Sequence, residues 1–430
     1  MTERRRIKVD YLARVEGEGA LDLVIDSGRI SEVRLKIFEP PRFFEAFLKG
    51  RHFTEAPDIT ARICGICPVA YQMSAVHAME HACDVRVDGS LRALRRLIYC
   101  GEWIESHALH VYMLHAPDFL GVHNVVEIAK EQPAIVERGL RLKKAGNALV
   151  ALIGGREVHP INVCVGGFFK APSARELEAL VPDLETALED ALATLDWVAG
   201  FDFPEFERDY ELIALSHPDE YPFNEGRIVS TRGLDIAQEE YHEHFEEAHV
   251  PHSTALHCRL RERGHYKVGP MARFALNYDR LRPRAKAAAE RVGLTPACRN
   301  PFRSIVVRTV EMIHAVEEAL ALIADYTPPA APAVAVSPRA ATGLAATEAP
   351  RGLLHHTYRI DAAGLIEFAQ IIPPTSQNQP TIEDDLRAFV APRLSLAEDA
   401  LRWQCEQAIR NYDPCISCSA HFLTLNVERR

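Results

Sequence analysis

Hydrophobic and polar positions alternate along residues 7–37, IKVDYLARVEGEGALDLVIDSGRISEVRLKI. In a strand, Leu21, Leu23 and Ile25 fall on one face, and the tripeptide DSG is a turn signal. The pattern predicts a small antiparallel meander at the N-terminus. A pair of prolines ends it, and residues 42–50 (RFFEAFLKG) then have the pattern of a short helix that ends at a glycine.

The apolar spacing changes to a helical period over most of the remaining chain. Residues 58–81 open with the first CxxC pair and continue into a predicted helical run, QMSAVHAMEHA. Helices are also predicted over residues 90–118, 124–150, 174–199, 281–326 and 381–412. Glycine and proline indicate an ordered loop at 154–172 and a linker at 327–340, whereas short strands and turns are expected at 203–280 and 343–380. The run EEYHEHFEEAH inside residues 203–280 is expected to be a solvated helix face, and Ser173 is expected to cap the helix that follows it.

These elements predict a mainly α protein with smaller β parts (α+β), and no internal repeat is visible. We expect one large domain over residues 1–430. Its parts are the N-terminal β meander (1–40), a helical core with the first CxxC pair (58–199), a mixed α/β insertion (200–280), helices and strands (281–412), the second CxxC pair (413–421) and a C-terminal tail (422–430).

Charge and composition narrow the class of protein. The chain has 49 basic and 60 acidic residues among 430, a formal net charge of −11, so a strongly basic nucleic-acid surface is excluded as a global property. No stretch approaches 18 uninterrupted apolar residues, so no membrane-spanning helix is expected. The basic N-terminus is followed by neither a secretory apolar region nor a twin-arginine pattern. The expected compartment is the cytoplasm, where thiols stay reduced.

Candidate chemistry is concentrated in the ten cysteines. Six stand singly and are expected to be small buried hydrophobic side chains: Cys83, Cys100, Cys164, Cys258, Cys298 and Cys405. The other four form two CxxC pairs at opposite ends of the chain: Cys64 with Cys67, and Cys415 with Cys418. Zinc ribbons separate such pairs by only about 15–20 residues, and four soft thiolates also suit nickel, iron or Cu(I).

The sequences around the two CxxC pairs resemble those of a known family. ARICGICPVAY near the N-terminus and YDPCISCSAH near the C-terminus resemble the large, catalytic subunit of [NiFe] hydrogenases. RVEGEG, the length and RICGICPVAYQMSAVHA most resemble the cytoplasmic, multimeric group, whose members couple hydrogen to NAD(P) and in some cases also reduce sulfur. The resemblance implies the long-helix bundle core of that family, and catalysis of the heterolytic splitting of H2.

The resemblance also implies a set of metal ligands. Cys64 and Cys415 would be terminal thiolates on nickel, and Cys67 and Cys418 would bridge nickel to an iron that carries cyanide and carbon monoxide. A nearby divalent ion, usually magnesium, would be held by three further groups: Glu45, His421 and the backbone of Ile371.

Further residues match the family's surroundings of the metals. Glu16 in RVEGEG would pass protons out, the alternative being a structural glutamate at a strand end. Arg351 would lie over the metals beside Pro350, with Asp118 and Asp413 around it, although these acids also suit a purely local structural role. Pro374 and Thr375 would hydrogen-bond one cyanide. Tyr71 departs from the family, many members of which have histidine there, and its hydroxyl is still able to hydrogen-bond a sulfur.

The resemblance implies partners as well. They are a small hydrogenase subunit with iron–sulfur clusters, diaphorase-type subunits that hold flavin and NAD(P), nickel chaperones, and an endopeptidase that removes the tail 422–430 after His421. Because this chain has no convincing GxGxxG motif and no cysteines left for clusters, NAD(P), flavin and iron–sulfur clusters are expected elsewhere. Other acceptors, namely a deazaflavin-type carrier or polysulfide, are compatible with the sequence.

Three alternatives stand beside the catalytic subunit. A hydrogen-sensing regulatory subunit would have the same metals but generally lacks such a tail. A quinone-reducing subunit of the complex I type would share the fold, although those relatives lack the four cysteines. A zinc-binding structural protein would use the cysteines as a long-range staple.

Overall fold

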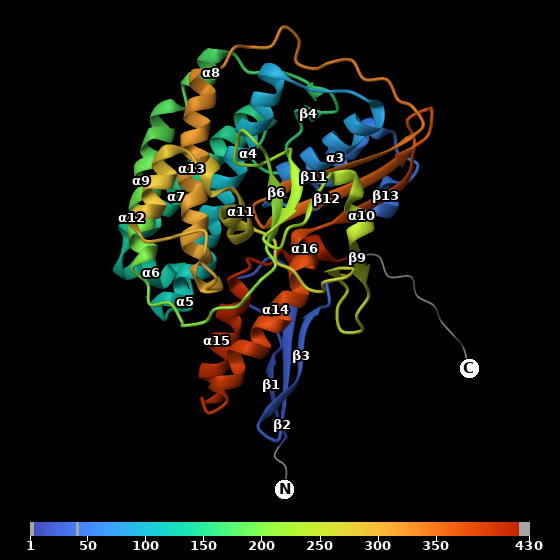
Figure 1. Cartoon of the computed structure of the whole chain (residues 1–430). Coiled ribbons are helices and arrows are strands. Elements are labelled where there is room, and N and C mark those ends of the chain that lie inside the picture. The colour runs from blue at the N-terminus through green and yellow to red at the C-terminus, as the bar shows by residue number, and fades with distance from the viewer. Residues whose placement is uncertain (1–3, 40–42, 421–430) are drawn as a thin grey trace, which may run out of the picture.

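A computed structural model of the chain describes residues 4–39 and 43–420. In Figure 1, long helices gather on one side, a sheet with α3 lies on the other, and a meander with two C-terminal helices lies below them. The observed architecture confirms the predicted mixture of helices with smaller antiparallel sheets. The predictions for His421 and the tail 422–430 lie outside the described residues.

The predicted N-terminal meander is present as a three-stranded antiparallel sheet. Its strands, in spatial order, are β1 (Arg4–Val9), β2 (Gly19–Asp26) and β3 (Arg29–Ile37). The apolar face of this sheet forms one core with helices α14 (Pro374–Val390) and α15 (Glu398–Arg410). The pairing ties the first residues of the chain to the segment that leads to the second CxxC pair.

The main core lies among long helices. They are α3 (Pro68–Cys83), α4 (Gly89–Leu109), α7 (Pro133–Gly154), α9 (Val181–Ala199) and α13 (Ser304–Ala324). The α4–α7 contact depends on glycine, because a Cβ on Gly146 would lie 2.6 Å from the carbonyl oxygen of Gly101. Of the described helices, none is long and apolar enough to cross a membrane.

Prolines divide several of the predicted helices, because a proline lacks the N–H that an interior helical position donates. Five predicted helices are therefore each split into shorter segments. The resulting pairs are α6 (Val125–Glu131) with α7, α8 (Ala174–Glu178) with α9, α12 (Pro283–Arg291) with α13, α14 with α15, and α4 with α5 (Ala116–Leu120). A π-helical segment at His110–His115 joins α4 to α5. Ser173 caps α8 as predicted, since its Oγ accepts from the Glu176 N–H.

A second three-stranded sheet lies against α3. Its order is β11 (Ala341–Ala349), β12 (Gly352–Ile360) and β13 (Ile366–Ile372), all antiparallel. The strands predicted at 343–380 are thus confirmed as far as residue 372. Residues 374–380 are helical instead, because α14 begins at Pro374, in the first turn where proline is favoured.

The remaining described elements are short. They are α1 (Phe44–Leu48), α2 (Ala56–Ala61), β4 (Val163–Cys164), β5 (Gly167–Phe168), β6 (Ile213–Ser216), β7 (Arg227–Ser230), β8 (Asp235–Ile236), α10 (Tyr241–His244), β9 (Phe245–Ala248), β10 (His257–Leu260), α11 (Pro270–Asn277) and α16 (Ile416–Ser419). Single 3₁₀ turns lie at Phe53–Glu55, Gln238–Glu240, Tyr278–Arg280, Pro301–Arg303 and Ala391–Arg393.

The acidic, histidine-containing run at 239–249 is not the predicted solvated helix. Only α10 is α-helical, and β9 then pairs with β10 in an antiparallel ladder. Tyr241 and Phe245 are buried and stack on each other with ring centroids 4.3 Å apart. Burial of these two large aromatic side chains therefore explains why the charged run packs against the protein instead of forming a solvated helix.

Candidate metal centre

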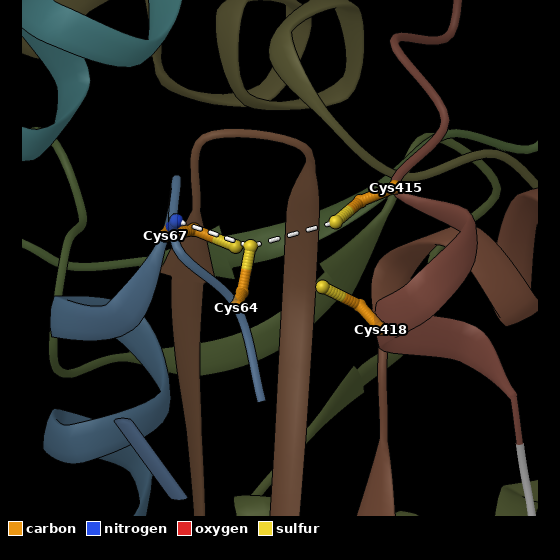
Figure 2. A group of neighbouring side chains, drawn as sticks. All are labelled: Cys64, Cys67, Cys415 and Cys418. Atoms are coloured by element: carbon orange, nitrogen blue, oxygen red, sulfur yellow. Dashed lines mark hydrogen bonds between the residues drawn. The ribbon is translucent and has the colours of Figure 1, made fainter. Parts of the chain in front are cut away.

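The two CxxC pairs meet in the interior. Cys64 and Cys67 lie just before α3, Cys415 precedes α16, and Cys418 lies in it. All four side chains are buried, and their sulfurs lie within 4.8 Å of one another. The Sγ atoms of Cys64 and Cys415 are 3.5 Å apart, and Figure 2 shows the sulfurs of the two chain segments pointing toward each other.

Backbone geometry orients both pairs. The Sγ of Cys64 accepts from the N–H groups of Ile66 and Cys67, both at 3.3 Å, where the chain turns into α3. Backbone N–H groups aimed at a sulfur favour its anionic form. On the other side, the carbonyl of Glu16 accepts from the Ile416 N–H at 2.8 Å and fixes the loop that carries Cys415.

The four thiols do not share one acidity. Hydrogen bonding from Cys415, and then from the other two cysteines, lowers the pKa of Cys64 well below its ordinary value. Burial, together with the neighbouring sulfurs, raises the pKa of Cys415 well above its ordinary value, and burial raises that of Cys418 to about 11. Four thiolates in one buried site therefore require a cation to compensate their charge.

The residues fit a soft metal centre. Four convergent sulfur donors are the ligand set that nickel, iron or zinc accepts. Two polar atoms beside them, Nη1 of Arg351 and the hydroxyl of Tyr71, are buried without a hydrogen-bond partner in the described structure. Buried polar atoms of this kind call for a ligand or water that completes the site. The Tyr71 hydroxyl, although able to hydrogen-bond a sulfur, does not do so in the described structure.

Arg351 occupies the turn between β11 and β12. Its Nε donates to the carbonyl oxygen of Asp413 at 2.7 Å, and its Nη2 donates to Oδ1 of Asp413 at 3.2 Å. Burial lowers the pKa of this guanidinium, but Asp413 and the cysteine sulfurs outweigh that effect and hold the pKa above its ordinary value. The side chain therefore supplies a permanent positive charge beside the sulfurs.

Asp413 is shared by two arginines. Besides Arg351, Arg308 on α13 places its Nη1 3.5 Å from Oδ2 of Asp413. No motif marks Arg308, since it sits in an apolar helix and its partner Asp413 lies more than a hundred residues away along the chain. A buried arginine in such a helix needs a carboxylate partner, and this is the one signal that could have pointed to it.

Asp118, predicted to lie around Arg351, forms its direct ion pairs in the described structure with two other arginines. Asp118 accepts from both Nε and Nη2 of Arg410, at 2.7 and 2.8 Å, and from Nη2 of Arg14 at 2.5 Å. The carboxylate joins α5 to α15 and to the N-terminal segment. Two arginines at the same carboxylate satisfy its charge, so Asp118 serves this three-way junction.

Glu16 lies directly beside the cysteines. The Cys415 thiol donates to its Oε2 at 3.1 Å, and the Ser417 N–H donates to the same oxygen at 3.1 Å. Gly17 makes the approach possible: its φ is +87°, and a Cβ there would lie 2.7 Å from the Ser417 nitrogen. Because Glu16 is only half-buried, it lies between the enclosed sulfurs and the surface.

Three further predicted residues are Thr375, its neighbour Pro374, and Pro350, which precedes Arg351. Oγ1 of Thr375 accepts from the Cys415 N–H at 3.0 Å, at the start of α14, whose first residue is Pro374. The carbonyl of Pro350 accepts from Nη2 of Arg273 at 3.0 Å. These residues stabilise the loops that carry Arg351 and Cys415.

The predicted magnesium ligands are partly brought together. Oε1 of Glu45 accepts from the Ile371 N–H at 2.8 Å, so α1 and β13 meet at this point. The third predicted ligand, His421, lies outside the described residues.

Sequence reasoning missed Glu102. Its buried carboxylate accepts from the N–H groups of Val69 and Ala70, at 2.6 and 3.1 Å, in the first turn of α3. Burial raises its pKa well above the ordinary value. The available signal was an acidic residue at a buried position of the long helix α4. Such a residue needs a partner, and the backbone N–H groups at the N-terminus of another helix supply one.

The single cysteines also follow the prediction in the main. Cys83, Cys100, Cys258 and Cys405 are buried, whereas Cys164 and Cys298 are half-buried. Each of the six has a free thiol.

Comparisons with known proteins agree with this site. A family model described as nickel-dependent hydrogenase matches residues 42–138 and 259–421. Sulfhydrogenase 1 subunit alpha of Pyrococcus furiosus is 33% identical over 97% of this chain and 98% of its own length. The NAD-reducing hydrogenase HoxS subunit beta of Cupriavidus necator is 27% identical over 97% of this chain and 95% of its own length.

A solved structure gives the same assignment. The NAD+-reducing [NiFe]-hydrogenase in its H2-reduced state superposes with a TM-score of 0.87 at 28% identity, covering 97% of this chain and 99% of that one. The shared sequence, the shared fold and the four convergent cysteines all indicate one family. The chain belongs to the nickel-dependent hydrogenases and is a large subunit of a [NiFe] hydrogenase.

Proposed function

We propose that this subunit catalyses the reversible heterolytic cleavage of H2 and passes electrons, through a partner iron–sulfur subunit, to NAD(P). The buried cluster of four cysteine sulfurs carries the proposal, because it joins the two ends of the chain in a ligand set that suits nickel and iron. The NAD-reducing relative supports the choice of acceptor.

In this proposal Cys64, Cys67, Cys415 and Cys418 would hold nickel, and Cys67 and Cys418 would also serve an iron that carries cyanide and carbon monoxide. When bound, such a centre supplies the splitting of H2 into protons and electrons. The protein's contribution is to hold four sulfurs, exclude water from them and provide groups that move the proton.

Glu16 is the proton acceptor. Its Oε2 lies 3.1 Å from the Cys415 sulfur, which is within hydrogen-bond reach for a proton on that sulfur. The Ser417 N–H stabilises the carboxylate and keeps it oriented. From the half-buried carboxylate the proton passes to solvent.

Arg351 provides fixed positive charge beside the centre, and Asp413 holds the guanidinium in place through two hydrogen bonds. The unpartnered Nη1 of Arg351 is available to an exogenous group in the site. Pro350, Pro374 and Thr375 line the segments next to the centre, where we assign them to binding the iron's diatomic ligands.

We assign Glu45, Ile371 and His421 to a magnesium or similar divalent ion. Contact between Glu45 and Ile371 supports the first two members of this set. We also propose a cytoplasmic, heteromultimeric enzyme, with diaphorase-type subunits for flavin and NAD(P), nickel chaperones, and endopeptidase removal of residues 422–430.

The test is H2-dependent reduction of NAD+ and NADP+ by the purified complex. Cys415→Ser should abolish the activity, because it removes a sulfur that we assign as a nickel ligand. Cys164→Ser is the matched control, since Cys164 is a half-buried free thiol outside the cluster, and it should retain activity. An active Cys415→Ser complex would contradict the proposal.

A further inference from the structure

A second group of metal-ligating side chains lies between the loop after β9, strand β10 and helix α14. It consists of His252, His257 and Glu383, and one ligand atom from each lies within 4.8 Å of the others. The three residues belong to neither the cysteine cluster nor the set Glu45, Ile371 and His421.

The positions of the imidazole nitrogens suit metal binding. Nε2 of His257 is shielded from solvent and has no hydrogen-bond partner in the described structure. Nε2 of His252 lies 2.8 Å from Oε1 of Glu383, and the two rings face each other edge to face with centroids 5.7 Å apart.

Hydrogen bonds hold the segments that carry the three residues in place. Glu383 lies inside α14, and its Oε1 also accepts from the Leu35 N–H at 2.8 Å. His257 begins β10, where it lies opposite Ala248 of β9. The loop that carries His252 is tied to the end of β3, because the Thr254 hydroxyl donates to the Ile37 carbonyl at 3.1 Å. Such a site loses little conformational entropy when an ion binds.

We propose that His252, His257 and Glu383 bind a divalent cation of the zinc class. Two imidazoles and one carboxylate are a typical borderline donor set, whereas Mg²⁺ and Ca²⁺ prefer oxygen ligands throughout. All three residues are only partly exposed, so an ion reaches them from solvent and keeps water in its remaining position.

The bound ion would clamp the 249–256 loop and β10 onto α14. This helix begins at Pro374 and presents Thr375 to the Cys415 backbone. The cation is structural, and the inference is independent of the reaction at the cysteines.

The experiment titrates Zn²⁺ into the mature complex, with its own nickel and iron in place, after chelator treatment has removed loosely held metal. His257→Ala and Glu383→Gln test the site. The first side chain has an unpartnered Nε2, and the second variant keeps an oxygen that accepts from the Leu35 N–H. His249→Ala is the control, because His249 is an exposed histidine of the same loop.

The unsubstituted complex and His249→Ala should each bind one additional zinc per large subunit. Both site variants should bind it at least about tenfold more weakly, as loss of a ligand dictates. X-ray absorption at the zinc edge should show nitrogen and oxygen neighbours only. Equal zinc affinity in all four proteins, or a sulfur neighbour of zinc, would overturn the inference. Melting curves recorded without zinc establish that the variants are folded.

Discussion

Replacing Glu16 by glutamine isolates the proton-transfer role of its carboxylate. The amide has almost the same size, and its oxygen still accepts the Ser417 N–H that now lies 3.1 Å from Oε2. It cannot accept a proton from the Cys415 sulfur, also 3.1 Å away. Geometry is therefore retained while one chemical step is removed.

The size of the effect follows from what remains around Cys415. Among the described residues, Glu16 is the carboxylate that hydrogen-bonds this sulfur. A positioned acid–base group contributes about 10²–10⁴-fold to a rate. The H2 oxidation rate of Glu16→Gln should therefore fall by about this factor, which corresponds to roughly 3–5 kcal/mol in activation free energy.

The assay is H2 oxidation with an artificial dye, so that electron transfer to NAD(P) does not limit the rate, together with exchange of D2 against solvent protons. Both rates should fall by a similar factor, while nickel and iron contents stay unchanged. Glu18→Gln is the matched control, because Glu18 is an exposed acid in the same RVEGEG segment. It should behave like the unsubstituted enzyme.

Glu16→Asp adds a graded test. It retains the carboxylate but shortens the side chain by one methylene, so its activity should lie between those of the unsubstituted enzyme and Glu16→Gln. A fully metallated Glu16→Gln complex whose exchange rate stays within about threefold of normal would show that Glu16 is not the proton acceptor, because so small a loss is far below that expected of an acid–base group.

Three further predictions concern the framework of the site. Burial lowers the pKa of Lys267 to about 8, so between pH 8 and 10.5 the unfolded chain binds more protons and stability rises with pH. In denaturant titrations, the free energy of unfolding of the unsubstituted protein, relative to that of Lys267→Met, should rise by about 3 kcal/mol from pH 7 to pH 11. A difference between the two proteins that does not change with pH would contradict this. Arg273→Met should lower the unfolding free energy by about 3–5 kcal/mol, because the buried carboxylates of Glu311 and Glu348 then lose their cation. A loss of unfolding free energy below about 1 kcal/mol would contradict this prediction. Thr375→Val should cost about 1–3 kcal/mol in stability by removing the acceptor of the Cys415 N–H, and Thr375→Ser should restore it in thermal melts.

Local patterns in the sequence predicted much of the fold. Alternation over residues 7–37 was sufficient for the meander, because one of its faces is buried. The boundaries of the helices failed where prolines stand inside an apolar period, as at Pro133, since the period continues although the hydrogen bonds do not. Residues 374–380 were missed because polar side chains there are buried by the neighbouring sheet and loops.

Part of the site could likewise be predicted from the sequence, and part could not. The spacing and the sequence motifs of the two CxxC pairs identified the four cysteines, and the family resemblance identified Glu16 and Arg351. The structure places all six residues together. Contacts across long sequence distances could not be foreseen. Asp118 pairs with Arg410 rather than with Arg351, because partner choice among buried charges depends on how the helices pack. The same reason explains why Arg308 and Glu102 were missed.

The central claim is that the four cysteines hold nickel and iron. Mass spectrometric metal analysis of the complex, produced together with its maturation proteins and after tail removal, tests it most directly. We predict about one nickel and one iron per large subunit, beyond any iron bound by partner subunits, and loss of nickel in Cys64→Ser. Zinc alone at the cysteines under these conditions would contradict the account and indicate a structural zinc site.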